Sequence, residues 1–231
     1  MEHEQAPVRP EPRISINSLA EYLTAPPVRR GAIVKAHKRP RPVVVAHYAQ
    51  AQKPIVEFLA AGGGSGAYLL RAAERLEAMA AQSGRPARTR MLLDSAAALQ
   101  RFAGALDVFT LPGPVSAVMP GPTPYLNLSG VRVSVRPELL YTVPSRNQAG
   151  LVKLYFSKTR PLSPEEAWYT TAALYRWGAD VAGLGESLVP QRCLVLDVFA
   201  GRTFAGARAF TRRLAELEAA CEEIALRWPG A

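Results

Sequence analysis

Three ionisable side chains lie in or beside segments that are otherwise apolar, and their chemistry depends on what they meet there. Lys153 belongs to an apolar run at 150–159, Asp197 to a second run at 193–199, and Glu138 follows an alternating segment. An unpaired charge in such a segment is costly, so Lys153 or a nearby arginine is the expected partner of Asp197. Together the three residues predict either a buried ion-pair network or a relocated metal or acid/base site.

The segments that must position these residues have clear local patterns. The two apolar runs are typical of buried strands. Apolar and polar residues alternate at 125–136 on either side of Ser129 and Gly130, which predicts a two-residue hairpin. A capping-box pattern at 163–166 begins a helix, and a last amphipathic helix is expected at 208–228.

The order of the expected elements predicts an α+β fold. Residues 1–13 are charged and contain prolines, which indicates a disordered tail, and residues 14–87 are expected to be helical. The glycine-rich stretch at 62–66 lacks the Gly-Lys-Ser/Thr of a phosphate-binding loop and is interpreted as a linker. Residues 88–231 then give helix, three strands, helix, one or two strands and helix. This order predicts a mixed sheet of about four to six strands flanked by helices.

The charge balance favours an anionic partner. The 231 residues include 28 Lys and Arg against 19 Asp and Glu, which gives a formal net charge of +9. Nucleic acid and an acidic protein surface are the partners that such a charge favours. No acidic residue interrupts the segment 28–41, so the alternatives for this segment are a phosphate-contacting patch and a solvated helix face. The candidate nucleic-acid-binding residues in it are Arg29, Arg30, Lys35, Lys38, Arg39 and Arg41.

Other classes of protein find little support in the sequence. No apolar run approaches the ~20 residues that cross a bilayer, and the first residues lack the features of a secretory signal, so we expect a cytoplasmic protein without a membrane partner. Cys193 and Cys221 have no Cys or His at metal-ligand spacing and are expected to be free thiols. No Gly-x-Ser-x-Gly motif is present. We expect no cofactor, and the sequence does not indicate an oligomeric state.

One stretch and its place in the element order resemble a known superfamily. The residues at 156–159 read Phe-Ser-Lys-Thr, and their position is similar to the third core strand of the PD-(D/E)XK nuclease-like superfamily, especially its RecB-like members. That strand carries an acidic-x-Lys motif, and the second core strand carries another acid. Lys158 matches the motif lysine, whereas Phe156 replaces its carboxylate. Val133 or Ser134 stands where the other acid belongs.

The resemblance covers residues 88–228 and implies a nuclease fold whose metal ligands are missing. Such nucleases hold Mg²⁺ with at least two carboxylates, which Phe and Val or Ser side chains cannot replace. We therefore expect a non-catalytic, nuclease-like protein that binds nucleic acid through its basic surface. One alternative is a protein–protein adaptor or assembly subunit without a nucleic-acid role. Another is a metal-dependent nuclease in which Glu138, Lys153 and Asp197 form a relocated site with Mg²⁺.

Overall fold

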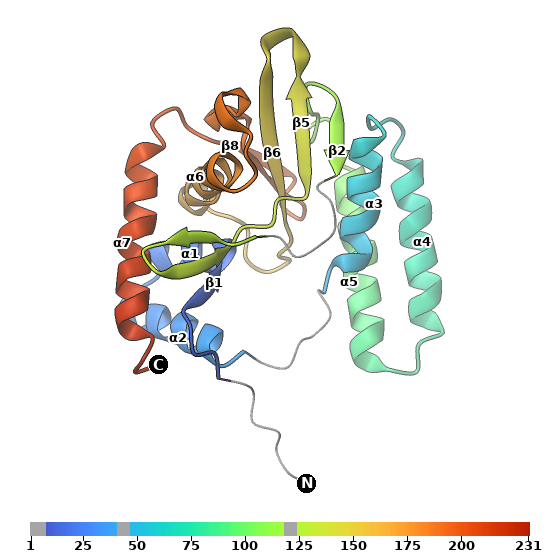
Figure 1. Ribbon diagram of the computed structural model, residues 1–231. Coiled ribbons are helices and arrows are strands. Elements are labelled where there is room, and N and C mark those ends of the chain that lie inside the picture. The colour runs from blue at the N-terminus through green and yellow to red at the C-terminus, as the bar shows by residue number, and fades with distance from the viewer. Residues whose placement is uncertain (1–7, 41–46, 118–123) are drawn as a thin grey trace.

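The computed structural model describes residues 8–40, 47–117 and 124–231 (Figure 1). Within these ranges the chain forms seven α-helices and two β-sheets, which confirms the expected α+β class. No helix within the described ranges combines the length and the apolar character that a membrane crossing requires.

The larger sheet has five strands in the order β2-β5-β6-β7-β8. Its strands are β2 (Val115–Ala117), β5 (Leu139–Val143), β6 (Gln148–Tyr155), β7 (Leu194–Asp197) and β8 (Arg202–Ala205). Strand β6 is central, parallel to β7 and antiparallel to β5. The two apolar runs of the sequence become β6 and β7, and both are buried on both faces, as their continuous hydrophobicity predicts.

A second sheet of three strands has the order β1-β4-β3. Strands β3 (Leu126–Leu128) and β4 (Val131–Ser134) form the expected hairpin, and Ser129 and Gly130 adopt positive φ angles of 45° and 78° in its turn. A single sheet was expected, but β4 and β5 belong to different sheets. Arg136 has a φ of 48° and Pro137 lacks an N–H donor, so the strand cannot continue between them.

The sequence predicts a disordered tail at 1–13, but the structure shows defined contacts from Arg9 onwards. Residues 1–7 lie outside the described residues. The Arg9 N–H donates to the carbonyl of Lys38 at 2.9 Å, and Trp228 Nε1 donates to the Arg9 carbonyl at 3.1 Å. Arg13 already belongs to β1 (Arg13–Ser15), which pairs in parallel with β4. These partners are distant in sequence, so the local composition could not reveal them.

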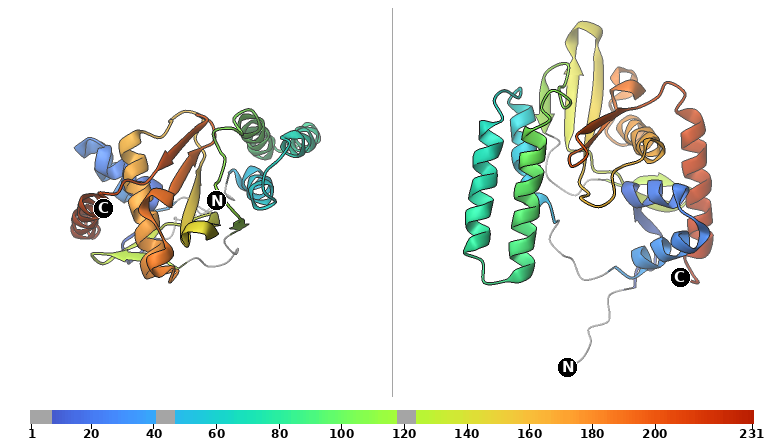
Figure 2. Two further views of the ribbon diagram at one scale, coloured as in Figure 1. Left: turned by 90° about the horizontal axis from the view of Figure 1, so that it is seen from above. Right: turned by 180° about the vertical axis from the view of Figure 1, so that it is seen from behind.

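Helices α3, α4 and α5 lie on one side of the five-stranded sheet, and α1, α2, α6 and α7 lie on the other (Figure 2). Their bounds are α1 (Ile16–Thr24), α2 (Pro27–Lys38), α3 (Ala49–Ala60), α4 (Ala67–Ala81), α5 (Pro86–Ala103), α6 (Pro164–Asp180) and α7 (Thr211–Arg227). One hydrophobic core joins α1, α2, α6 and α7 to Leu151 and Tyr155 of β6. The other joins α3, α4 and α5 to Val152 and Leu154. Alternate residues of β6 therefore anchor two separate cores.

The sequence predicts a boundary at residue 87, between a helical region and an α+β domain, but the two hydrophobic cores do not divide the chain there. That boundary passes between α4 and α5, but these two helices share one core with α3. Helices α1 and α2, which were expected to lie with α3 and α4, instead share the core of α6 and α7. The helical period of each segment predicts a buried stripe but does not say which layer receives it.

Candidate functional site

Lys153 forms a buried ion pair with Glu138. Lys153 Nζ lies 3.7 Å from Glu138 Oε1, with only 9% of each side chain exposed, and donates to the Arg136 carbonyl at 3.0 Å. The Glu138 carboxylate also accepts from Leu154 N at 2.7 Å and from Gln52 Nε2 at 3.0 Å. Burial raises the pKa of Glu138, while Lys153 and the backbone donors oppose this rise. The pair is saturated by internal partners, as expected of a structural network.

Asp197 lies apart from this pair. Its side chain is fully buried, with Oδ2 accepting from Leu162 N at 2.8 Å and Oδ1 accepting from Ala200 N at 3.1 Å. The expectation that Lys153 or an arginine pairs with Asp197 is therefore wrong. Strand β7 ends at Asp197 and the chain turns at once, so backbone N–H groups are available to satisfy the carboxylate.

The structure accordingly does not join Glu138, Lys153 and Asp197 by any contact between their side chains within the described residues. Nor do the described residues include a group of three or more His, Cys, Asp and Glu side chains placed to hold a metal ion. Lys153 and Glu138 form the buried ion pair that the sequence left open as an alternative, and Asp197 is satisfied separately by backbone N–H groups.

Two arginines of the basic α2 segment are paired with acids from other helices. Arg29 Nη2 lies 2.7 Å from Glu21 Oε1 on α1. Arg30 Nη1 lies 3.7 Å from Glu223 Oε2 on α7 and also donates through Nε to the Ala25 carbonyl. The segment itself contains no acid, but its neighbours in the fold supply two. The positive field expected from the sequence is therefore reduced.

The remaining candidates of this segment divide into two kinds. Lys38 Nζ donates to the carbonyls of Trp228 and Pro229, at 2.7 and 2.8 Å, and so fastens the end of α7. Lys35 and Arg39 are exposed, and their side chains form no hydrogen bond or ion pair with the residues that the structure describes. Arg41 lies outside the described residues. Of the five candidates that the structure describes, two are therefore unengaged cations on the α2 surface.

Lys158 belongs to a cluster of three polar side chains at the end of β6. Its Nζ lies 2.6 Å from Asp94 Oδ1 on α5, and His47 Nε2, just before α3, lies 2.7 Å from Asp94 Oδ2. Burial alone would raise the pKa of Asp94, but hydrogen bonds from Lys158 and His47 lower it. No pattern in the sequence links His47 or Asp94 to Lys158, because both are far from it along the chain.

Aromatic rings lie beside this cluster. Phe156, which stands where the resemblance places a carboxylate, stacks on Tyr48 with ring centroids 5.1 Å apart and an interplanar angle of 13°. Phe199 meets Tyr48 edge-on at 5.6 Å, and Lys158 Nζ lies 5.9 Å from the Phe199 ring centroid. The end of β6 therefore presents a cation and a stack of rings.

An open cleft of about 530 Å³ lies over this arrangement, and we refer to it as the Lys158 cleft. It is lined by His47, Tyr48, Arg90, Asp94, Phe156, Ser157, Lys158 and Thr159. A neighbouring hollow of about 620 Å³ shares Arg90, Asp94 and Lys158 with it and extends to the α4–α5 turn. Arg85 and Arg88 line a third hollow at that turn.

The side chains of the Lys158 cleft suit an anion better than a hard cation. Arg85, Arg88 and Arg90 are exposed and take part in no ion pair with described residues. Asp94 is the sole carboxylate among the lining residues of the cleft, and Lys158 and His47 occupy both of its oxygens. Mg²⁺ prefers several oxygen ligands, whereas guanidinium and ammonium groups bind phosphate directly.

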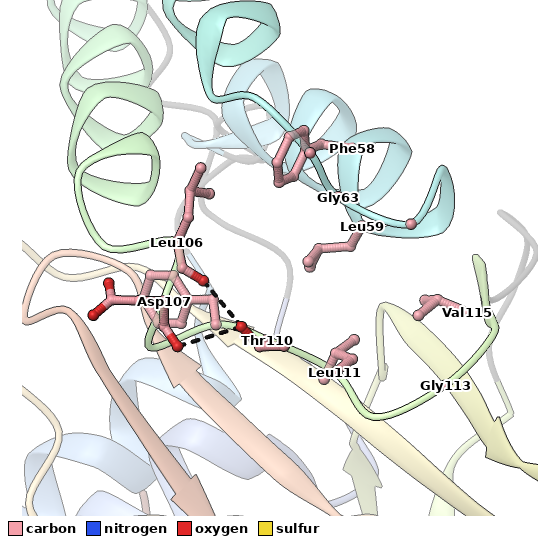
Figure 3. A pocket seen from close by; sticks show the side chains of 12 residues that line it. Phe58, Leu59, Gly63, Leu106, Asp107, Thr110, Leu111, Gly113 and Val115 are labelled. Carbon is pink, nitrogen blue, oxygen red and sulfur yellow. Dashed lines mark hydrogen bonds between the residues drawn. The ribbon is translucent and has the colours of Figure 1, made fainter.

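A different cavity, of about 370 Å³, lies between the ends of α3 and α5 and the segment that leads to β2 (Figure 3). Most of the side chains that line it are apolar, such as Phe58, Leu59 and Leu111. Thr110 Oγ1 donates to the carbonyls of Leu106 and Asp107, so its hydroxyl group is already engaged. Asp107 is the one charged side chain among the lining residues, so the cavity offers few side chains that would orient a ligand, and the Lys158 cleft is the stronger candidate.

Comparison with known proteins does not identify a family: no family model matches the sequence, and no curated protein matches it significantly.

Proposed function

We propose that the protein binds nucleic acid through the Lys158 cleft without cleaving it there. The observation that carries this proposal is the combination of a cation and stacked aromatic rings at the end of β6. There Phe156 stacks on Tyr48, and Lys158 is held by Asp94. A lysine and stacked rings suit direct contact with a nucleic-acid strand.

The cations along the cleft would contact phosphates. Lys158 and Arg90 lie in the cleft itself, and Arg85 and Arg88 extend the row of charges to the α4–α5 turn. Contacts of this kind release counterions from the nucleic acid, so they make affinity dependent on salt and largely independent of sequence.

The aromatic side chains favour a single strand over a duplex. Tyr48 and Phe156 are partly exposed and line the cleft. A single strand presents the faces of its bases, and stacking on an aromatic ring contributes roughly 1–3 kcal/mol per base. A duplex keeps these faces inside its own stack, so it would use only the phosphate contacts.

The proposal is tested by fluorescence anisotropy with labelled single-stranded and double-stranded oligonucleotides between 50 and 200 mM salt, concentrations over which phosphate contacts weaken strongly. We expect the single strand to bind more tightly, and Lys158→Ala and Arg90→Ala to weaken binding. Arg71→Ala is the matched control, because Arg71 is an exposed arginine of α4 that does not line the cleft.

Two results would contradict the proposal. The first is an absence of binding at 50 mM salt, where phosphate contacts are strong. The second is an equal loss of affinity in Lys158→Ala and in Arg71→Ala, because this would indicate a general effect of net charge. The same samples, incubated with Mg²⁺ or Mn²⁺ and separated on a gel, test for cleavage. Cleavage that Lys158→Ala abolishes would show that the cleft is catalytic.

A further inference from the structure

The outer face of the three-stranded sheet brings two arginines together. Ile14, Val131 and Val133 are buried on the inner face, so the pleat turns their neighbours outward. The register pairs Arg13 of β1 directly with Arg132 of β4. Like charges at directly opposite positions of a sheet repel each other, so this pairing needs a compensating interaction.

Tyr125 supplies part of that compensation. The Cζ atoms of Arg13 and Arg132 lie 4.6 and 4.3 Å from the centroid of its ring. The negative face of an aromatic ring attracts guanidinium groups, which orders both side chains around the same point. The ring carries no net charge, however, so the cluster stays positive.

Arg9 precedes β1, and its Nη1 donates to the carbonyl of His37 at 3.4 Å. Burial, together with the nearby charge of Arg13, lowers the pKa of Arg9. Burial, followed by the charges of Arg9 and Arg13, also lowers the pKa of His37 to about 4, so this imidazole is neutral near pH 7. Both shifts agree with a positive potential at this place.

The cluster meets a carboxylate at one position. Glu11 Oε2 lies 3.2 Å from Arg132 Nη1, with 71% of the Glu11 side chain and 45% of the Arg132 side chain exposed. Such an exposed pair is weak and easily exchanged. Among the described residues, Glu11 is the only acid within ion-pair distance of Arg13 or Arg132. The neighbouring guanidinium groups of Arg13 and Arg132 are therefore balanced by a single, exposed carboxylate.

We propose that Arg13 and Arg132 form a second binding site, for a phosphate group, and that Glu11 occupies the place of this phosphate when the site is free. Planar guanidinium groups match the oxygens of phosphate with paired hydrogen bonds. The phosphate belongs either to a free polyphosphate or to the backbone of a nucleic acid. The site shares no residue with the Lys158 cleft and does not depend on the function proposed for it.

Isothermal titration of the full chain with pyrophosphate, at constant ionic strength, tests this site. We expect Arg13→Gln and Arg132→Gln each to weaken binding by about tenfold, because each removes a charged hydrogen-bond donor. Glu11→Gln is the decisive variant, since removal of a competing carboxylate should strengthen binding roughly threefold. Damage to the fold would not produce such a gain. Arg71→Gln should leave pyrophosphate binding unchanged, because Arg71 is an exposed arginine of α4 outside the site.

Anisotropy with a labelled oligonucleotide distinguishes the two sources of phosphate. If the Arg13→Gln/Arg132→Gln variant loses affinity for both ligands, the site takes the backbone of a strand. If it loses only pyrophosphate, the site takes a free polyphosphate. The proposal is overturned if the unmodified chain does not bind millimolar pyrophosphate and the double variant binds the oligonucleotide normally. It is also overturned if Glu11→Gln weakens pyrophosphate binding.

Discussion

Lys153 Nζ lies 3.7 Å from Glu138 Oε1, and 9% of each side chain is exposed. The pair stands where β5 begins and β6 nears its end, and Glu138 also accepts the N–H of Leu154. Two charges removed from water depend on each other, because each compensates the desolvation of its partner. The pair therefore affects the free energy of unfolding mainly when one of its two charges is removed and the other stays buried without a partner.

Lys153→Met should destabilise the fold by about 3–5 kcal/mol, because it leaves a buried carboxylate without its cation. The double variant Lys153→Met/Glu138→Gln removes the orphaned charge and should recover part of this loss. Urea denaturation at pH 7 of the unmodified chain, both single variants and the double variant gives the coupling energy. Additive losses in the double variant would show that the two charges do not interact.

The Lys158 cleft should respond in opposite directions to two substitutions. Lys158→Ala removes a cation, so oligonucleotide affinity falls and the slope of log K against log salt decreases by about 1. Asp94→Asn keeps the shape of the side chain but removes the negative charge that neutralises Lys158, so affinity rises. Anisotropy titrations over a series of salt concentrations measure both effects. A fall in affinity in both variants would mean that Asp94 serves mainly to position the lysine.

Local patterns predict much of this fold, and long-range contacts account for what they miss. Residues such as Ser129 and Gly130 specify their turn by their own conformational preferences, and the continuous apolar runs specify buried strands. The pairing of Arg29 with Glu21 instead depends on how α1 meets α2, which no local pattern contains. A basic segment without acids is therefore not evidence of an unneutralised surface.

The candidate site shows the same limit. Lys158 stands out in the sequence through its resemblance to a motif, but its partner does not. Asp94 reaches Lys158 from α5, 64 positions away in the numbering, and His47, which precedes α3, binds the other oxygen of Asp94. A single acid on the wetter side of a helix gives no signal of such a contact. The same reason explains why Leu162 was not foreseen as a partner of Asp197, since it lies 35 positions away.

The capping box of α6 should contribute measurably to stability. Ser163 Oγ accepts from Glu166 N, and the Glu166 carboxylate accepts from Ser163 N and binds Arg160 at 2.6 Å. Ser163→Ala should cost about 1 kcal/mol, as the loss of an N-cap usually does. Glu166→Ala should cost about 2–3 kcal/mol, because Glu166 is buried and also neutralises Arg160. Thermal and urea unfolding measure the loss of stability in each variant. Equal losses would contradict the expectation that Glu166→Ala costs more than Ser163→Ala.

Glu216 should make stability depend on pH in the acid range. Its carboxylate accepts hydrogen bonds from Arg213, Tyr169 and Arg212. Burial alone would raise the pKa of Glu216, but these donors outweigh it and lower the pKa from 4.5 to about 2. Because the folded pKa is depressed, the charged form stabilises the fold above pH 4.5, and this contribution is lost as the pH falls towards 2.

Glu216→Gln should accordingly lose about 1 kcal/mol at pH 7, a small value because the side chain is partly exposed to solvent. The difference from the unmodified chain should shrink as the pH falls below 4.5 and vanish near pH 2. Urea midpoints at pH 7, 5 and 3 measure this trend. A difference that stays constant over this range would show that the charge of Glu216 is not the cause.

Gly150 lies at a place in β6 where no side chain fits. A Cβ atom added there would lie 2.3 Å from the carbonyl oxygen of Arg192 and 2.5 Å from Cε1 of Tyr141. The first neighbour is backbone, so it cannot rotate away as the end of a side chain can. Gly150→Ala should destabilise the fold by about 3 kcal/mol, at the upper end of the cost of overpacking.

Gly31→Ala provides the control, because an added Cβ at Gly31 meets nothing within 4 Å and the residue lies within α2. Alanine is the better helix former, so this variant should gain about 0.5–1 kcal/mol. The two substitutions make the same chemical change and should shift the urea midpoint in opposite directions. A urea midpoint of Gly150→Ala equal to that of the unmodified chain would contradict the close approach of Gly150 to the backbone of Arg192.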